Sequence, residues 1–288
     1  MEGLLEAFAD PAFQILLGEA QKRAAATERE CDYNLLSELL VAHVQKGQNR
    51  TQKAGINRAV EIVSDIDSQA LCALTVSHAV LAFSPVTGVT YDGLKVLDGL
   101  FNKLIYDELP SGKSWLDHLD VLGAIRWSTI GNMKKFREYY TSRLDGYSCA
   151  GIKRSSDDYQ KAVDILAKAN ISSKLLVDNE CLDGYVRLNL NSKRSIPTLA
   201  FFLDSQPIPL TSVQIDAVNN VWNLYTKEVQ AKQDARDNFM KLLSSFDELV
   251  ELEQWWDKIP GTFHVSQVGC VLAHTNAKRC DPRIPDLI

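Results

Sequence analysis

The chain has 288 residues, of which 45% are hydrophobic, and it carries a formal net charge of -6. This apolar content suffices for a sizeable core, which argues against extensive disorder, and the length allows one large domain or two smaller ones. With only 15 glycines and 9 prolines, the composition favours a mainly α-helical protein over a β-sandwich or barrel.

The cysteines and the N-terminal residues predict a cytoplasmic protein. Six cysteines are scattered without close pairs, and Cys72 and Cys270 lie within apolar helical patterns, as reduced and buried cysteines do. The first residues are acidic where a secretory signal peptide needs basic ones. Residues 68–91 carry no formal charge, but their apolar part, 70–83, is shorter than the roughly 20 residues of a membrane span. We therefore expect no membrane span.

Apolar residues recur every three or four positions through residues 1–106 and predict five consecutive helices. Asp10 and Pro11 form a typical helix start, an N-cap residue followed by proline at the first helical position. A polar loop at 46–50 separates the second helix from the third, which Thr51 is expected to cap. The helices are expected to begin near residues 11, 33, 52, 70 and 90.

The pattern becomes looser after residue 114. Short helices are expected around Trp115 and Phe136, and Ser156 is expected to cap another. Residues 175–177 and 185–190 are typical of short strands, because the second segment alternates cleanly between apolar and polar residues. A small β element therefore follows the helical first half.

Residues 145–151 are the best candidate linker in the chain, because glycine and serine interrupt the periodic pattern there. The sequence thus predicts an N-terminal helical unit, 1–150, and a C-terminal helical unit with short strands, 151–288. The whole is expected to be a mainly α, multi-helix assembly.

Two strand-to-helix corners are expected in the C-terminal unit. Residues 263–265 are typical of a short strand, Ser266 stands at the N-cap position, and Gly269 allows the first helical turn to lie close to other backbone. Residues 208–218 repeat the pattern more weakly, with Gln214 in place of Gly269. The similarity suggests a duplicated corner.

The sequence of this last corner resembles a known family. Residues 263–279, F-H-V-S-Q-V-G-C-V-L-A-H-T-N-A-K-R, are similar to L-T-x-V-G-x-x-I-A-x-A-N-x-K-R, the C-terminal signature of an uncharacterised bacterial protein family, and depart from it at Val265, Ser266 and Thr275. Residues 8–22 resemble that family's opening, F-x-D-P-x-x-Q-x-x-L-x-x-A-x-K. The resemblance implies a helical, bacterial, cytosolic protein and transfers no catalytic residue. Similar corners occur in families linked to abortive infection and phage defence and in the wing of winged-helix proteins.

Motifs for catalysis or cofactor binding are incomplete. Residues 110–114 contain the end of a phosphate-binding P-loop, but Asp107 stands where the first glycine belongs. The soft metal ligands His264, Cys270, His274 and Cys280 lack the usual paired spacing of zinc sites. The sequence therefore predicts no catalytic, cofactor-binding or metal-binding residue, although an unrecognised active site stays open as an alternative.

The best functional lead is a basic region at 126–194, with 13 Lys and Arg against 8 Asp and Glu, whereas 1–125 has 10 against 17 and 195–288 has 8 against 12. Cations can neutralise phosphates and aromatic rings can stack on bases, so this region is a candidate for binding a polyanion or an acidic partner. An ordinary solvated face is the alternative. The candidate residues are Arg126, Lys134, Lys135, Arg137, Tyr139, Arg143, Lys153 and Arg154.

Together these patterns favour a non-enzymatic interaction or regulatory protein of a bacterial cell, which acts through protein contacts or self-association. The resemblance adds phage defence as its expected setting. A nucleic-acid-binding protein that uses the basic region or a winged-helix-like corner is one alternative, and an enzyme with an unrecognised site is another.

Overall fold

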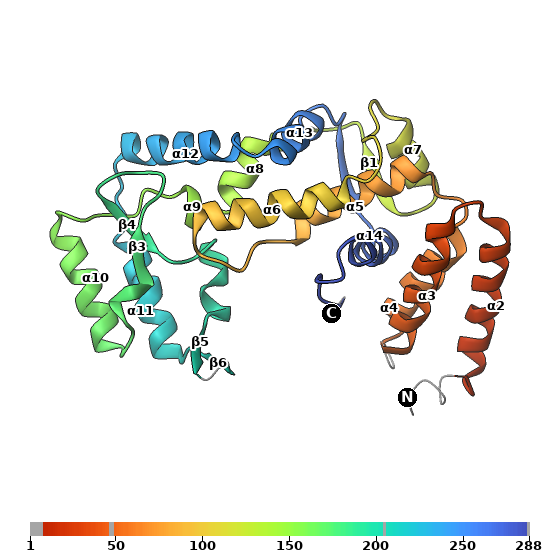
Figure 1. Cartoon of the computed structure of the whole chain (residues 1–288), viewed down its shortest axis with the longest axis horizontal. Coiled ribbons are helices and arrows are strands. Elements are labelled where there is room, and N and C mark those ends of the chain that lie inside the picture. The colour runs from red at the N-terminus through yellow and green to blue at the C-terminus, as the bar shows by residue number, and fades with distance from the viewer. Residues whose placement is uncertain (1–7, 46–48, 204–205, 287–288) are drawn as a thin grey trace. The chain divides into compact units, whose positions relative to one another are not determined.

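The protein is mainly helical, as the composition predicts, with a few short antiparallel strands (Figure 1). The computed structural model describes residues 8–45, 49–203 and 206–286. Most of the strands lie in the C-terminal half, where the small β element is expected.

The chain forms two compact units, each assembled from separate segments. Unit 1 consists of Met1–Phe83, Leu100–Met133 and Trp255–Ile288, and unit 2 consists of Ser84–Gly99 and Lys134–Gln254. These units do not coincide with the predicted division at residue 150, because the C-terminal segment completes unit 1 together with the N-terminal helices.

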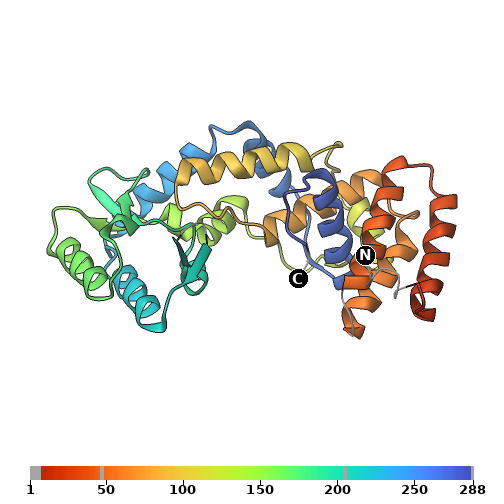
Figure 2. The same ribbon diagram turned by 60° about the horizontal axis from the view of Figure 1, so that its bottom comes forward.

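In unit 1, helix α14 packs against α3, α4 and α5. The dark blue C-terminal helix lies beside the red and orange N-terminal helices in both views (Figures 1 and 2). The buried face of α14 includes Val271, Leu272, Ala273 and Ala277, so hydrophobic burial joins the two ends of the chain. The helices are α2 (Pro11–Ala26), α3 (Glu30–Gln45), α4 (Arg50–Ile62), α5 (Ser68–Ala82), α7 (Ser114–Val121), α14 (Gln267–Cys280) and the end of α6 (Thr90–Leu104).

The starts of these helices follow local capping rules. The side chain of Asp10 accepts a hydrogen bond from the backbone of Ala12, which confirms the predicted first cap. The predicted cap at Thr51 is wrong, because Asn49 accepts from the backbone of Gln52 and the helix already begins at Arg50. Most of the predicted polar loop before it, at 46–48, lies outside the described residues.

The predicted corner after residue 265 is confirmed. Strands β1 (Ile125–Ser128) and β7 (Thr262–Val265) pair antiparallel, and the Ser266 side chain accepts from the backbone of Gly269. A Cβ atom at Gly269 would lie 2.0 Å from the Ala124 carbonyl oxygen, so only glycine allows this close approach.

Unit 2 contains the other strands and a second core. Strands β2, β4 and β3 form a three-stranded antiparallel sheet, and β5 pairs with β6. Val186 and Leu188 of β4 pack with Leu166 of α10 and Val218 of α11 in one hydrophobic cluster. The elements are the first part of α6, α8 (Phe136–Arg143), α9 (Asp145–Ser148), β2 (Ile152–Lys153), α10 (Asp157–Lys168), β3 (Leu176–Asp178), β4 (Tyr185–Leu188), β5 (Ala200–Leu203), β6 (Gln206–Pro209), α11 (Ser212–Asn223), α12 (Val229–Leu243) and all but the last two residues of α13 (Asp247–Trp256).

The weaker corner of the predicted pair also has the expected local form. Thr211 caps α11 through a capping box with Gln214, whose side chain in turn accepts from the Thr211 backbone. Strand β6 precedes this cap, as β7 precedes Ser266.

The prediction of a linker at 145–151 is wrong, because the segment lies inside unit 2 and its first four residues form the short helix α9. Gly146, Tyr147 and Ser148 are buried. A Cβ atom at Gly146 would lie 2.3 Å from the Leu190 carbonyl oxygen, so this glycine serves close packing rather than flexibility.

In unit 2, an ion pair is centred on Arg187, which is fully buried, while its partner Glu180 is partly exposed. Its guanidinium donates to Glu180 at 3.0 Å, to the Thr90 hydroxyl at 2.7 Å and to two backbone carbonyls. Glu180 also accepts from the backbone N–H groups of Thr90 and Tyr91 at the start of α6. Partial burial raises the pKa of the Glu180 carboxyl, but the hydrogen bonds from Thr90 and Tyr91 and the Arg187 charge outweigh this, and the net shift is downward.

In unit 1, a second buried polar group is His78 of α5. Its ring lies 5.7 Å, centroid to centroid, from that of His274 on α14, and it packs edge-on against Phe83. Burial, with a smaller contribution from His274, lowers the pKa of His78 to about 4. His78 is therefore neutral in the folded protein at neutral pH.

We expect Glu180→Ala to lower the free energy of unfolding by about 3 kcal/mol, because it leaves the Arg187 charge buried without its carboxylate. Urea denaturation followed by circular dichroism measures the change. Asp178→Ala is the matched control, since Asp178 pairs with Arg154 at an exposed site where ion pairs contribute little. Equal losses in the two variants would contradict the structural role of the pair that Glu180 forms with the buried Arg187.

We expect the free energy of unfolding to fall by up to about 3 kcal/mol as pH decreases from about 6.5 to 4, because the unfolded chain then binds a proton that folded His78 does not. Well above pH 6.5 the His78 side chain is neutral in both the folded and the unfolded chain, so its full contribution to stability is present. His78→Gln should flatten this part of a pH series of urea denaturations. His264→Gln, at an exposed position of β7, should leave it unchanged. An unaltered slope in His78→Gln would refute the assignment.

Candidate functional site

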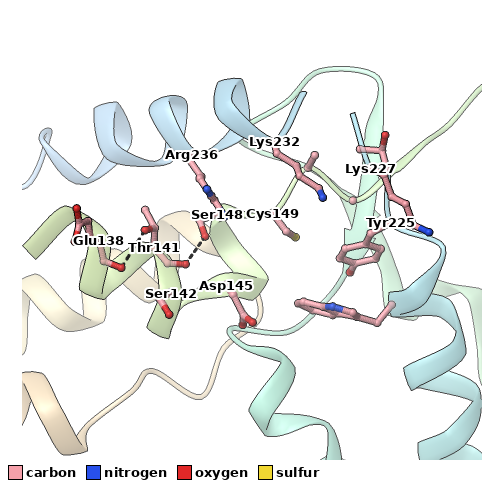
Figure 3. Close-up of a pocket in the computed structure, with 14 residues that line it drawn as sticks. Glu138, Thr141, Ser142, Asp145, Ser148, Cys149, Tyr225, Lys227, Lys232 and Arg236 are labelled. Carbon is pink, nitrogen blue, oxygen red and sulfur yellow. Dashed lines mark hydrogen bonds between the residues drawn. The ribbon is translucent and has the colours of Figure 1, made fainter. Parts of the chain in front are cut away.

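A pocket of about 640 Å³ lies within unit 2. Its walls come from α8 and α9, the segment that follows α9, the C-terminal end of α11 and the first half of α12 (Figure 3). The backbone N–H of Thr226 donates to the Gly151 carbonyl at 2.8 Å and ties two of these walls together. This volume is typical of a site for a small ligand.

Three cations line the pocket. Lys232 and Arg236 are four residues apart on α12 and so share one helix face, from which both reach into the pocket, while Lys227 follows α11 (Figure 3). All three side chains are exposed. Within the described part of the chain, none of them forms an ion pair with an acidic side chain. Their positive charges are therefore available to a ligand.

An aromatic pair forms another part of the lining. The rings of Trp222 and Tyr225 are stacked with centroids 4.6 Å apart and an interplanar angle of 29°. The Tyr225 hydroxyl accepts from the backbone N–H of Leu188 at 2.8 Å, which fixes its ring. The Lys193 ammonium lies 5.9 Å from the centroid of the Trp222 ring. The pair is thus a held aromatic surface with a cation nearby.

The wall formed by α8 and α9 is polar and acidic. It carries Glu138 and Asp145, and one carboxylate oxygen of Asp145 accepts from the backbone N–H of Lys193 at 2.8 Å. The Ser148 hydroxyl donates to the Thr141 carbonyl at 2.7 Å (Figure 3). The Thr141 hydroxyl donates to the carbonyl of Arg137. Both hydroxyl protons are therefore engaged in hydrogen bonds to the protein backbone.

Cys149 is the thiol of the pocket. Burial raises its pKa to about 12, although the Arg187 charge acts in the opposite direction. Its Sγ lies 3.3 Å from the Gly146 carbonyl oxygen as a donor. At neutral pH the thiol is protonated, and the thiolate form that a nucleophile requires is absent. Among the described residues that line the pocket, there is no histidine to act as its base.

The structure distributes the predicted basic residues over several elements. Arg126 lies in β1 of unit 1. The other seven belong to unit 2: Lys134 and Lys135 precede α8, Arg137, Tyr139 and Arg143 lie on α8, Lys153 ends β2 and Arg154 follows it. None of the eight is among the described residues that line the pocket.

Several of the predicted cations already have partners. Arg137 forms an ion pair with Asp237 of α12, and Arg154 forms one with Asp178 of β3. Arg126 lies 3.8 Å from Asp120. Aspartates thus neutralise three of the predicted charges. Burial raises the pKa of Tyr139, to which Arg143 donates a hydrogen bond.

Sequence reasoning missed the three cations of the pocket. Lys227, Lys232 and Arg236 lie outside the basic region, in a segment with more acidic than basic residues. The spacing of Lys232 and Arg236 on one face of a polar helix was a local signal, and Trp222 and Tyr225 lie just before them. No local sequence pattern indicated that α8 and α9 line the same pocket as these residues.

The structure bears on two other sequence readings. In the described ranges, no group of three or more His, Cys, Asp or Glu side chains is placed to hold a metal ion, so the soft ligands near the C-terminus do not gather into such a group. Those same ranges contain no helix with both the length and the apolar character needed to cross a bilayer.

No curated protein and no solved structure matches the chain. One protein-family model matches residues 2–284. It names no activity, ligand or partner. Because the match covers nearly the whole chain, the protein belongs to this uncharacterised family.

Proposed function

We propose that the protein is a non-enzymatic binding protein that takes an anionic ligand in the pocket of unit 2. The observation that carries this proposal is a set of three cations at one pocket, Lys227, Lys232 and Arg236, which have no acidic partner among the described residues. Like charges at close quarters repel one another, and a bound anion relieves this repulsion while it gains charge-assisted hydrogen bonds.

The other polar groups of the pocket support binding rather than catalysis. Burial raises the pKa of both the Cys149 thiol and the Tyr225 hydroxyl, so both are protonated at neutral pH. The hydroxyls of Thr141 and Ser148 donate to backbone carbonyls. A general base next to an activated nucleophile, which most hydrolytic and transfer sites need, has no counterpart among these groups.

The wider cellular role rests on fewer observations. All six cysteines are free, which supports a reducing, cytoplasmic setting. Action through protein contacts or self-association stays a prediction. A part in bacterial phage defence depends on the resemblance of residues 263–279 alone.

We expect pyrophosphate, used as a small anionic probe, to bind the full chain, and Lys232→Gln or Arg236→Gln to weaken binding about tenfold each, because each removes a charge-assisted hydrogen bond. Isothermal titration calorimetry measures the dissociation constant. Affinity should fall as salt is added, since salt screens exposed charges.

Lys241→Gln provides the matched control. Lys241 lies on the same helix, is exposed and does not line this pocket, so its replacement should leave the affinity for pyrophosphate unchanged. An absence of pyrophosphate binding, or equal losses in all three variants, would refute the proposal.

A further inference from the structure

The pocket is lined by more functional groups than the binding of a simple anion requires. Its cations account for a phosphate, but the Trp222–Tyr225 stack and the carboxylates of Glu138 and Asp145 do not. A carboxylate beside an anion site weakens binding of an inorganic anion through repulsion. These groups therefore point to a ligand with a planar part and with hydrogen-bond donors in addition to its negative charge.

The aromatic pair suits a flat ring system. Trp222 is half-buried, its ring is stacked on Tyr225, and the Tyr225 hydroxyl is held by the backbone of Leu188. Lys193, the cation near Trp222, is exposed, so its side chain can move aside or pair with the negative charge of the ligand. Because this ring is already held in place, stacking of a base on it costs the protein little conformational entropy.

The acidic wall suits sugar hydroxyls. An ionised carboxylate only accepts hydrogen bonds, so it needs a donor from the ligand. One Asp145 oxygen is occupied by the backbone of Lys193, and within the described residues the other oxygen has no hydrogen bond. In Figure 3, Asp145 lies on the opposite side of the pocket from Lys232 and Arg236. A ligand with hydroxyls at one end and negative charge at the other satisfies both walls.

From these three features we infer that the pocket binds a ribonucleoside diphosphate or triphosphate, with the base on Trp222, a ribose hydroxyl on Asp145, and the phosphates on Lys232, Arg236 and Lys227. This inference rests on the proposed anion-binding function and specifies its ligand. The pocket volume of about 640 Å³ suits one such molecule.

Calorimetric titration of the full chain with ADP, GDP, CDP, UDP, pyrophosphate and adenosine tests the inference. At least one nucleoside diphosphate should bind about tenfold tighter than pyrophosphate, because stacking adds to the phosphate contacts. Asp145→Asn should weaken that nucleotide severalfold and leave pyrophosphate bound at least as tightly as before, since it removes a ribose acceptor and a negative charge.

Trp222→Leu should remove the preference for the nucleotide over pyrophosphate, and Trp222→Tyr should keep most of it. Retained pyrophosphate binding in Trp222→Leu shows that the pocket is still folded. If Trp222→Leu loses both ligands, Trp222→Tyr decides: a preference that matches wild type supports the inference, and its loss overturns it.

The remaining outcomes separate the inference from the function on which it rests. Pyrophosphate binding without any nucleotide preference would overturn the inference and leave anion binding intact. Binding of no probe at all would overturn both, as would adenosine binding as tightly as ADP while pyrophosphate does not bind. Tighter binding of a short single-stranded RNA than of every mononucleotide would overturn the assignment to a free nucleotide.

Discussion

The burial of Arg187 is the constraint on which unit 2 depends. A guanidinium without water is tolerated only when a carboxylate and several acceptors surround it, and here Glu180, the Thr90 hydroxyl and backbone carbonyls do so. The same guanidinium lies 5.6 Å from the ring centroid of Tyr147 in α9. One charge thus ties strand β4, the start of α6 and the helix that forms a wall of the pocket. Helix α9 in turn contributes Asp145 and Ser148 to the lining of the pocket.

The features that the sequence predicted well are those set by neighbours along the chain. Caps such as Asp10 and Ser266 and the periodic apolar faces of the helices depend on residues within one or two turns. The cap at Thr51 failed because Asn49, two residues earlier, can make the same kind of bond. The linker at 145–151 failed because the role of Gly146 depends on Leu190, which is far away in sequence.

The charged residues of the candidate site were missed for the same reason, because their pairing depends on residues that are distant in sequence. A count of Lys and Arg along a segment does not reveal which of them meet an aspartate in space, and Arg137 and Arg154 do. Conversely, Lys232 and Arg236 belong to a net acidic segment and line the pocket without an acidic partner among the described residues. Available charge is thus a property of tertiary pairing. The charge count of a segment therefore does not identify the residues whose charge is available to a ligand.

The contact between Gly269 and the Ala124 carbonyl affects how homologous chains are recognised. A methyl group at residue 269 would push the first turn of α14 away from the strand pair, so this corner tolerates no larger side chain there. The glycine is a geometric requirement, whereas the apolar residues around it can exchange among themselves with repacking. In an alignment of diverged chains, a substitution in this column would therefore mark a lineage whose corner has been rebuilt.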